Sequence, residues 1–351
     1  MVILNLIKNT EMGNKNIYAL TDYRGSFESK NNAIPYNSGM DQELLNKYFA
    51  YHQVNLVYMF FGDVMNYEAS FWKYKTVIYT SSEDTGYYYK SFIEDVIYYL
   101  ELVGANVIPC YKYLKANNNK VFMELVRHSF NEEKLQNVSS KVFGTFEEMN
   151  RVVSSFTYPL VYKEAAGAMS HGVGLAHNQK ELIKKIKKTS RTPNFFRELW
   201  EYGRSIKYIG YIRESKYKKK FIIQNLVDGL NDDYKVLIFG EKYYVLQRCV
   251  KKGDFRASGS GIRNFVKEIP QGILEYAHLC KKVLSVPNVS LDIAYNGESF
   301  FLIEFQCLYF GSFTLTNSDF YWNKTEEDFF VLTESKSILE EEYVRSIVNF
   351  I

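Results

Sequence analysis

The sequence predicts an α+β protein in which an α/β lobe precedes two lobes built around antiparallel sheets. The chain has 351 residues, more than the ~250–300 at which a single core stops growing, so several lobes are expected. Residues 54–109 read as strand, helix and strand, a succession typical of a parallel βαβ unit. From residue 221 onward, strands and turns alternate with one intervening helix, which favours antiparallel pairing.

The first lobe is predicted from local patterns. Residues 54–61 and 76–79 are short apolar runs typical of buried strands. Residues 88–102 carry apolar side chains at helical spacing, and Gly104 stands where a helix C-cap is expected. A polar break at residues 117–120 then ends the lobe.

We therefore divide the chain into an N-terminal α/β lobe, residues 1–117, and a second domain, residues 118–351, with subdomains 118–205 and 206–351. In the second domain we expect helices at 121–129, 146–155 and 271–284, and strands at 158–163, 221–226, 234–239, 242–247, 290–295 and 300–306, the last two forming a final pair.

Composition and charge exclude several classes of protein. Hydrophobic residues make up 46% and charged residues 24%, which argues against disorder. A net charge of +3 gives no electrostatic reason to expect a nucleic-acid partner. The four cysteines include no CxxC pair, which argues against a metal cluster and fits a reducing compartment. No window of about 18 apolar residues exists, so we expect no membrane span, no membrane partner and a cytoplasmic protein.

A strand followed by a glycine-rich loop is the first candidate binding element. Lys163 ends the predicted strand, and Gly167, Ser170, Gly172 and Gly174 lie in the loop after it. Small residues let backbone N–H groups approach phosphate oxygens, and a lysine adds a cationic donor. No GK[ST] sequence closes the loop, so it is not a Walker motif, and an ordinary flexible turn remains the alternative.

The last predicted hairpin is more informative. In residues 290–295, Leu291 and Ile293 alternate with Asp292, and in residues 301–306 the apolar Phe301, Ile303 and Phe305 alternate with Glu304 and Gln306. A two-residue turn at Asn296 and Gly297 would put the two apolar faces on opposite sides of the sheet. We therefore predict a loop of odd length, with Gly297 at positive φ.

That register would place Asp292, Glu304 and Gln306 on one polar face. Two carboxylates and an amide oxygen form a hard-oxygen site that suits Mg²⁺, which takes one or two carboxylates together with nucleotide phosphates. The alternative is a solvated sheet face with unrelated charges.

Basic side chains form a third candidate group. Lys235, Arg248 and Arg256 are cationic, and the guanidinium groups suit recognition of phosphate or carboxylate. A flexible polar hairpin loop is the alternative for the segment around Arg256. Two lysine runs, residues 184–188 and 216–220, are interpreted as solvated faces rather than nucleic-acid sites.

Taken in order, these pieces resemble the ATP-grasp superfamily, and within it the carboxylate–amine ligases of the type that adds glutamate to a ribosomal protein. The resemblance runs from about Lys120 to Gln306, and residues 233–237 (DYKVL) resemble the family's D-x-R-x-L segment, with Lys235 where arginine is commoner. It implies nucleotide contacts from Lys120, Lys163, Gly167, Ser170, Gly172, Gln224, Leu226, Val227, Asp233 and Lys235, catalytic roles for Lys163, Arg248 and Arg256, and metal ligation by Asp292, Glu304 and Gln306. The third metal ligand is usually asparagine in the family, so Gln306 is a departure.

The resemblance implies an ATP- and Mg²⁺-dependent ligase acting through an acyl phosphate, with a small-molecule carboxylate and an amine or thiol as substrates. An amino acid, a peptide or a sugar acid would fit, and a homodimer is left open. The first lobe would help to bind substrate, with Ser81, Ser82, Glu83, Tyr89 and Lys90 as candidates. The alternatives are an ATP-grasp kinase of small molecules and a non-catalytic ATP-binding module.

Overall fold

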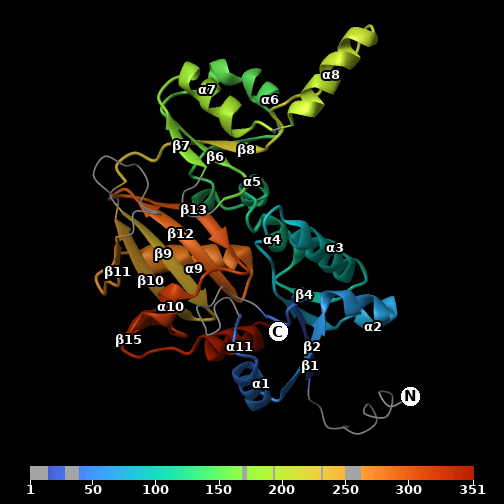
Figure 1. Ribbon diagram of the computed structural model, residues 1–351. Coiled ribbons are helices and arrows are strands. Elements are labelled where there is room, and N and C mark those ends of the chain that lie inside the picture. The colour runs from blue at the N-terminus through green and yellow to red at the C-terminus, as the bar shows by residue number, and fades with distance from the viewer. Residues whose placement is uncertain (1–14, 28–38, 168–171, 193, 231, 250–261) are drawn as a thin grey trace.

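The computed structural model shown in Figure 1 describes residues 15–27, 39–167, 172–192, 194–230, 232–249 and 262–351. Its strands form three sheets, one in the N-terminal lobe, a small one in the middle of the chain and a large one in the C-terminal half. The predicted architecture, antiparallel sheets behind an α/β lobe, is confirmed.

The N-terminal lobe is a four-stranded parallel sheet in the order β2-β1-β3-β4. The predicted helix is α3, and Gly104 follows it at φ +84°, in the conformation that a C-terminal glycine supplies. The sequence patterns missed the central strand β1 and helix α1. The elements are β1 (Lys15–Thr21), α1 (Gln42–Tyr51), β2 (Val54–Phe60), η2 (Phe61–Asn66), α2 (Ala69–Trp72), β3 (Thr76–Tyr79), α3 (Tyr88–Leu102), β4 (Asn106–Ile108) and α4 (Tyr111–Ala116).

The small sheet is antiparallel, in the order β5-β8-β6-β7. Strand β8, which the predicted boundary at residue 205 assigns to the second subdomain, pairs here with β5 and β6, and the domain boundaries themselves stay a prediction. The elements are α5 (Lys120–His128), η3 (Glu133–Leu135), β5 (Ser140–Phe143), α6 (Phe146–Asn150), η4 (Val153–Ser155), β6 (Leu160–Glu164), β7 (Val173–Ala176), α7 (Gln179–Thr189), α8 (Phe195–Lys207) and β8 (Phe221–Asn225).

The large sheet runs in the order β13-β12-β9-β10-β14-β15, with β11 beside β10. The predicted strand pair at residues 290–306 is confirmed as β12 and β13, but it is not the final pair, because β14 and β15 follow it and extend the opposite side of the sheet. The elements are β9 (Asp232–Phe239), β10 (Lys242–Cys249), β11 (Arg263–Asn264), α9 (Ile273–Leu284), β12 (Asn288–Tyr295), β13 (Phe300–Gln306), α10 (Phe313–Thr316), β14 (Tyr321–Lys324), β15 (Phe330–Thr333) and α11 (Leu339–Phe350).

The two faces of the large sheet have different partners because side chains alternate along each strand. Val236 and Leu291 lie on the face that forms one core with helix α9. Leu237 and Tyr244 lie on the other face, where one end packs with α11 and the N-terminal lobe. The remaining part of that second face carries the charged residues considered below.

The hairpin of β12 and β13 reaches its register by a different route from the predicted one. Tyr295 pairs with Phe300, so four residues form the loop, and the predicted odd length is wrong. A bulge between Asp292 and Ile293 shifts the pairing by one residue and leaves Ile303 unpaired. The shift restores the pairing of Asp292 with Glu304, and Gly297 has the predicted positive φ, +97°.

The bulge also changes which apolar residues enter the core. Leu302 and Phe305 are buried in the core with α9, whereas Phe301 and Ile303 are half-buried. The predicted burial of Phe301 and Ile303 is therefore wrong, because a simple alternation cannot anticipate an extra residue within a strand.

Replacing Leu302 by Ala is expected to lower the free energy of unfolding by about 2–5 kcal/mol, as for a fully buried leucine. Ile303→Ala is the matched control and should cost about 1 kcal/mol or less, since Ile303 is half-buried. Urea unfolding of the two variants measures the difference. A larger loss for Ile303→Ala would contradict the bulge.

Candidate active site

A band of charged side chains crosses four strands of the large sheet. Arg248 on β10 pairs with Asp233 on β9, Lys235 on β9 pairs with Asp292 on β12, and Asp292 pairs with Glu304 on β13. Paired residues in neighbouring strands point to the same face, so the five side chains share one face of the sheet. The predicted polar face is therefore confirmed and is wider than the hairpin alone.

Arg248 links two carboxylates within this band. Its Nε atom donates to Asp233, and its Nη2 atom lies 3.0 Å from Oδ2 of Asp292. The other oxygen of Asp292 accepts from the Lys235 ammonium at 3.1 Å. All four side chains are largely shielded from solvent. Because water does not solvate these charges, they must be compensated by one another.

The pKa values of the band follow from this pairing. Burial opposes ionisation of Asp292, but Arg248 and Lys235 outweigh it and hold the pKa of Asp292 well below its ordinary value. Burial raises the pKa of Asp233 to about 6, although Arg248 works against that shift. Of the two aspartates, Asp292 is therefore the one that remains an ionised carboxylate across the physiological pH range.

Lys163 brings the small sheet to this band. It lies on β6 and is buried, and burial lowers the pKa of its ammonium to about 8 while Glu124 and Glu304 oppose that shift. Glu304 belongs to the large sheet, so the electrostatic interaction between Lys163 and Glu304 acts across the two sheets. The fold thus brings within electrostatic range two residues that are about 140 positions apart in the sequence.

Helix α5 fills the corner between the sheets. Its first residue, Lys120, donates from Nζ to the Gly167 carbonyl at 2.7 Å and from its backbone N–H to the Ala165 carbonyl at 2.8 Å. On the same helix Arg127 pairs with Glu124 and donates to the Leu302 carbonyl of β13. Sequence reasoning missed Glu124 and Arg127, whose available signal was an i,i+3 pair of opposite charges.

The predicted adenine contacts lie at the end of β8. Gln224 is buried, and its Nε2 donor has no hydrogen-bond partner among the described residues. Leu226 and Val227 follow the strand and are half-buried. A buried donor without a partner costs free energy unless a ligand or water satisfies it, so this amide group is a candidate for contacting a bound molecule.

The glycine-rich loop is described only at its ends. Gly172 has φ +73°, and a Cβ atom there would lie 2.9 Å from the Glu164 side chain, so the position requires glycine. Gly167, whose carbonyl accepts from Lys120, marks the other end. Ser170 and Arg256, predicted nucleotide-binding and catalytic residues, lie outside the described residues.

The three predicted metal ligands lie on one side of the β12–β13 hairpin. Gln306 is two residues from Glu304 on β13 and so shares its face, and it pairs across the hairpin with Ser290. Over the described ranges, no group of three or more His, Cys, Asp or Glu side chains is placed to hold a metal ion. Two carboxylates and an amide do not form such a group, and the metal assignment stays a prediction.

The candidates in the N-terminal lobe mostly make contacts within that lobe. Lys90 is buried and donates to the Asn117 carbonyl at 2.6 Å and to Glu94 at 3.1 Å. Glu83 accepts from Asn118 at 2.7 Å, and Ser82 donates to Asp84 at 2.9 Å. Two further candidates are Ser81, whose buried hydroxyl makes no hydrogen bond to a described residue, and Tyr89, which packs edge-on against Tyr23.

No family model and no curated protein matches the sequence. Comparison with solved structures does find similar folds. A D-cycloserine synthetase aligns with 95% of this chain and 99% of its own at 11% identity, with a TM-score of 0.52. An N5-carboxyaminoimidazole ribonucleotide synthetase bound to ADP aligns with 98% of this chain and 79% of its own at 10% identity and a TM-score of 0.54.

A third similar structure is an ATP-grasp ligase associated with a ribosomally made peptide (RiPP) from Chryseobacterium gregarium, solved with ADP and a leader and core peptide. It aligns with 95% of this chain and 97% of its own at 12% identity, with a TM-score of 0.50. Identities this low establish the fold and nothing finer. Over nearly its whole length, this chain has the fold of the ATP-grasp ligases.

Proposed function

We propose that this protein is an ATP-dependent ligase that activates a carboxylate as an acyl phosphate and joins it to an amine or a thiol. The observation that carries the proposal is the charged band of Asp233, Lys235, Arg248, Asp292 and Glu304 on one face of the large sheet, with the buried Lys163 within electrostatic range of Glu304. Cations and carboxylates buried together between two sheets are suited to a polyanion that arrives with its own counter-ion.

ATP is assigned to the space between the two sheets. We assign the Gln224 amide and the chain at Leu226 and Val227 to the base, and Lys120 and Lys163 to the phosphates, and the unpartnered Gln224 donor supports this assignment. We also assign Asp233 and Lys235, the two members of the charged band on β9, to nucleotide binding. The similar synthetase and the similar RiPP-associated ligase were both solved with ADP, which supports a nucleotide as ligand.

The donor set of Asp292, Glu304 and Gln306 fits Mg²⁺. The low pKa of Asp292 keeps it anionic, and all three oxygen donors are hard. Six charged groups of the site, three cationic and three anionic, already balance, so binding a triphosphate needs further positive charge. Bound Mg²⁺ would supply that charge and polarise the phosphate oxygens.

In the two steps of the proposed reaction, cationic side chains stabilise the negative charge that develops. A carboxylate oxygen of the substrate attacks the γ-phosphorus, the bond to the β–γ bridging oxygen breaks, and ADP leaves. We assign Lys163 and Arg248 to stabilise negative charge on the transferred group, and their burial beside the charged band supports this role. An amine nitrogen then attacks the acyl carbon and loses a proton, and phosphate leaves. We assign Arg256 to the acyl oxygen in this step on the family resemblance.

The substrates are a small-molecule or peptide carboxylate and an amine. The similar structures include a D-cycloserine synthetase and a ligase bound to a leader and core peptide, so both sizes of substrate occur on this fold. We leave an amino acid, a peptide and a sugar acid as alternatives. All four cysteines are free thiols, which supports a cytoplasmic location.

Product analysis tests the reaction directly. With Mg·ATP, release of ADP and phosphate is expected only when a carboxylate and an amine are both present, because the acyl phosphate needs both to turn over. Mass spectrometry of the mixture identifies the amide. A stable phosphorylated product without amine would indicate a kinase, and tight ATP binding with no turnover against any pair would indicate a binding module.

Glu304→Ala is expected to abolish ATP turnover while the protein stays folded, because it removes a carboxylate from the assigned metal site. Steady-state phosphate release measures the loss, and circular dichroism checks the fold. Glu298→Ala, in the exposed loop of the same hairpin, is the control and should leave turnover unchanged. Near-normal turnover in Glu304→Ala would rule out the metal assignment.

The affinity for ATP is expected to fall by up to about tenfold per pH unit above about pH 8. The pKa of Lys163 is lowered to about 8, so at higher pH the ammonium must regain a proton before it can pair with phosphate. Calorimetric titration of ATP across this range measures the dependence.

Arginine does not titrate in this range, so Lys163→Arg should remove the pH dependence. Below about pH 8, Lys163→Met should bind ATP roughly tenfold to a hundredfold more weakly than the wild type, the loss of a charge-assisted hydrogen bond, and the difference should shrink as the wild-type lysine loses its proton at higher pH. A decline above pH 8 that persists in both variants would show that another group titrates.

A further inference from the structure

Helix α8 has the reverse of the usual burial pattern, with its apolar side chains outside and a charged one inside. Its only buried residue is Glu201, while its aromatic and aliphatic side chains face solvent. Phe196 is 82% exposed and Phe195 is 69% exposed, and Trp200 is about half exposed. Figure 1 shows the helix projecting from the small-sheet lobe beyond α6 and α7. A monomeric protein seldom leaves so many large apolar side chains together in water unless they meet a partner.

The exposed side chains form an ordered stripe. Phe195, Leu199, Tyr202 and Ile206 follow one another at spacings of four, three and four residues, which is one face of a helix, and all four are exposed. The chain turns back at residues 208–211, and Ile209 in that turn is 106% exposed. We call residues 194–215 the arm, with α8 along its length and this turn at its far end.

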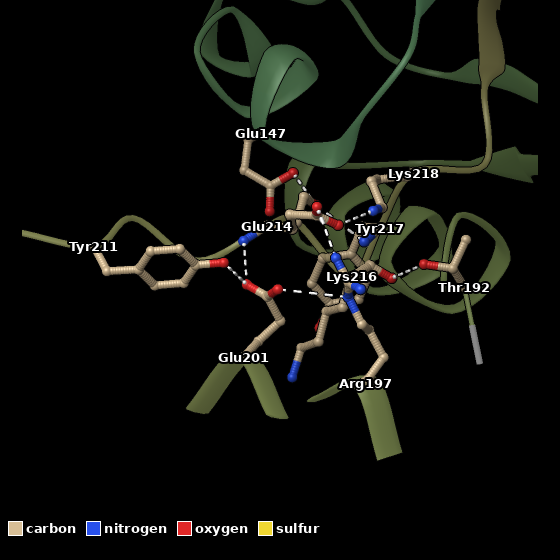
Figure 2. A network of polar contacts seen from close by, with 10 residues as sticks. Glu147, Thr192, Arg197, Glu201, Tyr211, Glu214, Lys216, Tyr217 and Lys218 are labelled. Carbon is tan, nitrogen blue, oxygen red and sulfur yellow. Dashed lines mark hydrogen bonds and ion pairs between the residues drawn. The ribbon is translucent and has the colours of Figure 1, made fainter. Parts of the chain in front are cut away.

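A network of polar contacts holds the other face of α8, as Figure 2 shows. Glu201 accepts a hydrogen bond from the Tyr211 hydroxyl at 2.8 Å and another from the Glu214 backbone N–H at 3.1 Å. Arg197 lies 3.5 Å from Glu201 and 3.1 Å from Glu214. The returning chain therefore covers the polar face of the helix, and the apolar stripe is left outward.

The base of the arm is tied to its lobe. The Thr192 N–H donates to the Lys216 carbonyl and the Lys219 N–H to the Ser190 carbonyl, each at 2.9 Å. Ser215 donates from its hydroxyl to Glu147 on α6 at 2.7 Å. These hydrogen bonds fix the arm to its lobe and so fix the outward orientation of the apolar stripe.

Charge is concentrated in the same part of the chain. Residues 180–220 hold fourteen Lys and Arg and four Glu, a net charge of +10, whereas the whole chain is +3 and the remainder is therefore −7. The acids of the arm are engaged locally, Glu198 by Arg191, Glu201 by Arg197 and Glu214 by Lys218. The surplus of this segment is cationic and includes both lysine runs noted in the sequence.

We propose that the arm binds the surface of a lipid bilayer that carries anionic headgroups. The apolar stripe enters the interface between headgroups and acyl chains, and the surrounding lysines and arginines meet the lipid charges. Aromatic side chains are suited to that boundary because each ring has an apolar body, and Trp and Tyr also have a polar end.

A bilayer fits this surface better than a protein does. The apolar side chains stand on a projecting helix and on the turn at its end, so a protein would need a matching groove, whereas a bilayer deforms around them. Two copies of the arm packed together would oppose two cationic surfaces of like sign, which disfavours a second copy as the occupant.

Surface binding needs no spanning helix. Among the described residues, no helix has the length and apolar character that a bilayer crossing requires. The expectation of no membrane partner considered spanning segments only, and a helix that lies in the plane of the surface is a different case. The arm projects away from the large sheet, so binding through it leaves the charged band of Asp292 and Glu304 clear of the membrane.

Sedimentation with lipid vesicles tests the proposal on the full chain. The protein should bind phosphatidylcholine vesicles that contain phosphatidylserine at least about tenfold more tightly than vesicles of phosphatidylcholine alone, and added salt should weaken the binding. Equal binding to both vesicles, or to neither, would overturn the proposal.

A triple variant, Phe195→Ser with Leu199→Ser and Ile206→Ser, should weaken vesicle binding at least about tenfold and leave the fold intact, because all three side chains are exposed. The matched control replaces three exposed apolar residues elsewhere, Phe329→Ser with Val331→Ser and Ile338→Ser, and should bind as the wild type does. Equal effects of the two triples would overturn the role of the arm.

Tryptophan fluorescence gives a second readout. Trp72 and Trp322 are buried, so Trp200 is the tryptophan whose surroundings change when the arm enters lipid. A shift of its emission to shorter wavelength on adding anionic vesicles, absent in Trp200→Phe, supports the proposal. If sedimentation velocity instead shows self-association that the stripe variant abolishes, and the emission does not shift with vesicles, the stripe is a protein interface and the proposal fails.

Discussion

The pairing of Arg248 with two carboxylates is the constraint on which the large sheet depends. Asp233 and Asp292 lie on different strands, and both are shielded from solvent, so each needs compensating charge, which Arg248 supplies to both and Lys235 adds at Asp292. A slip of one residue in either strand would turn these charges toward the apolar core beneath the sheet. These paired charges thus disfavour a slipped register of β9, β10 or β12.

The bulge at Ile303 shows how a strand can serve a core and a site together. The edge strand β13 must bury Leu302 and Phe305 against helix α9 and present Glu304 next to Asp292. A regular strand cannot place residues 302 and 305 on one face, because their spacing is odd. One extra residue corrects the phase, so the position of the assigned metal carboxylate and the filling of the core come from the same irregularity.

The surroundings of Lys163 and the arm differ in how their charges are balanced, and this difference suits each to a different kind of anionic partner. Around Lys163 the cations are buried and balanced by Glu124, Glu304 and the carboxylates of the large sheet, which suits selective binding of a compact polyanion. Along the arm the cations are in excess and next to exposed apolar side chains, which suits an extended anionic surface. Both regions belong to the lobe of the small sheet, so one lobe would handle nucleotide and membrane.

The sequence by itself determined the local elements and the chemistry of the site. Alternation in residues 290–306 was enough to predict the shared face of Asp292 and Glu304, because it depends on residues close in the chain. The ATP-grasp fold was predicted from the resemblance of the ordered motifs between Lys120 and Gln306 to that family. Only the tertiary structure decided that Lys163 comes within electrostatic range of Glu304, that Arg248 pairs with two carboxylates, that a bulge replaces an odd loop and that α8 turns its aromatic stripe outward. Each of these features depends on burial and charge between segments that are far apart in the chain, or on a reversal of the chain. The periodicity of one segment cannot predict which other segment packs against it.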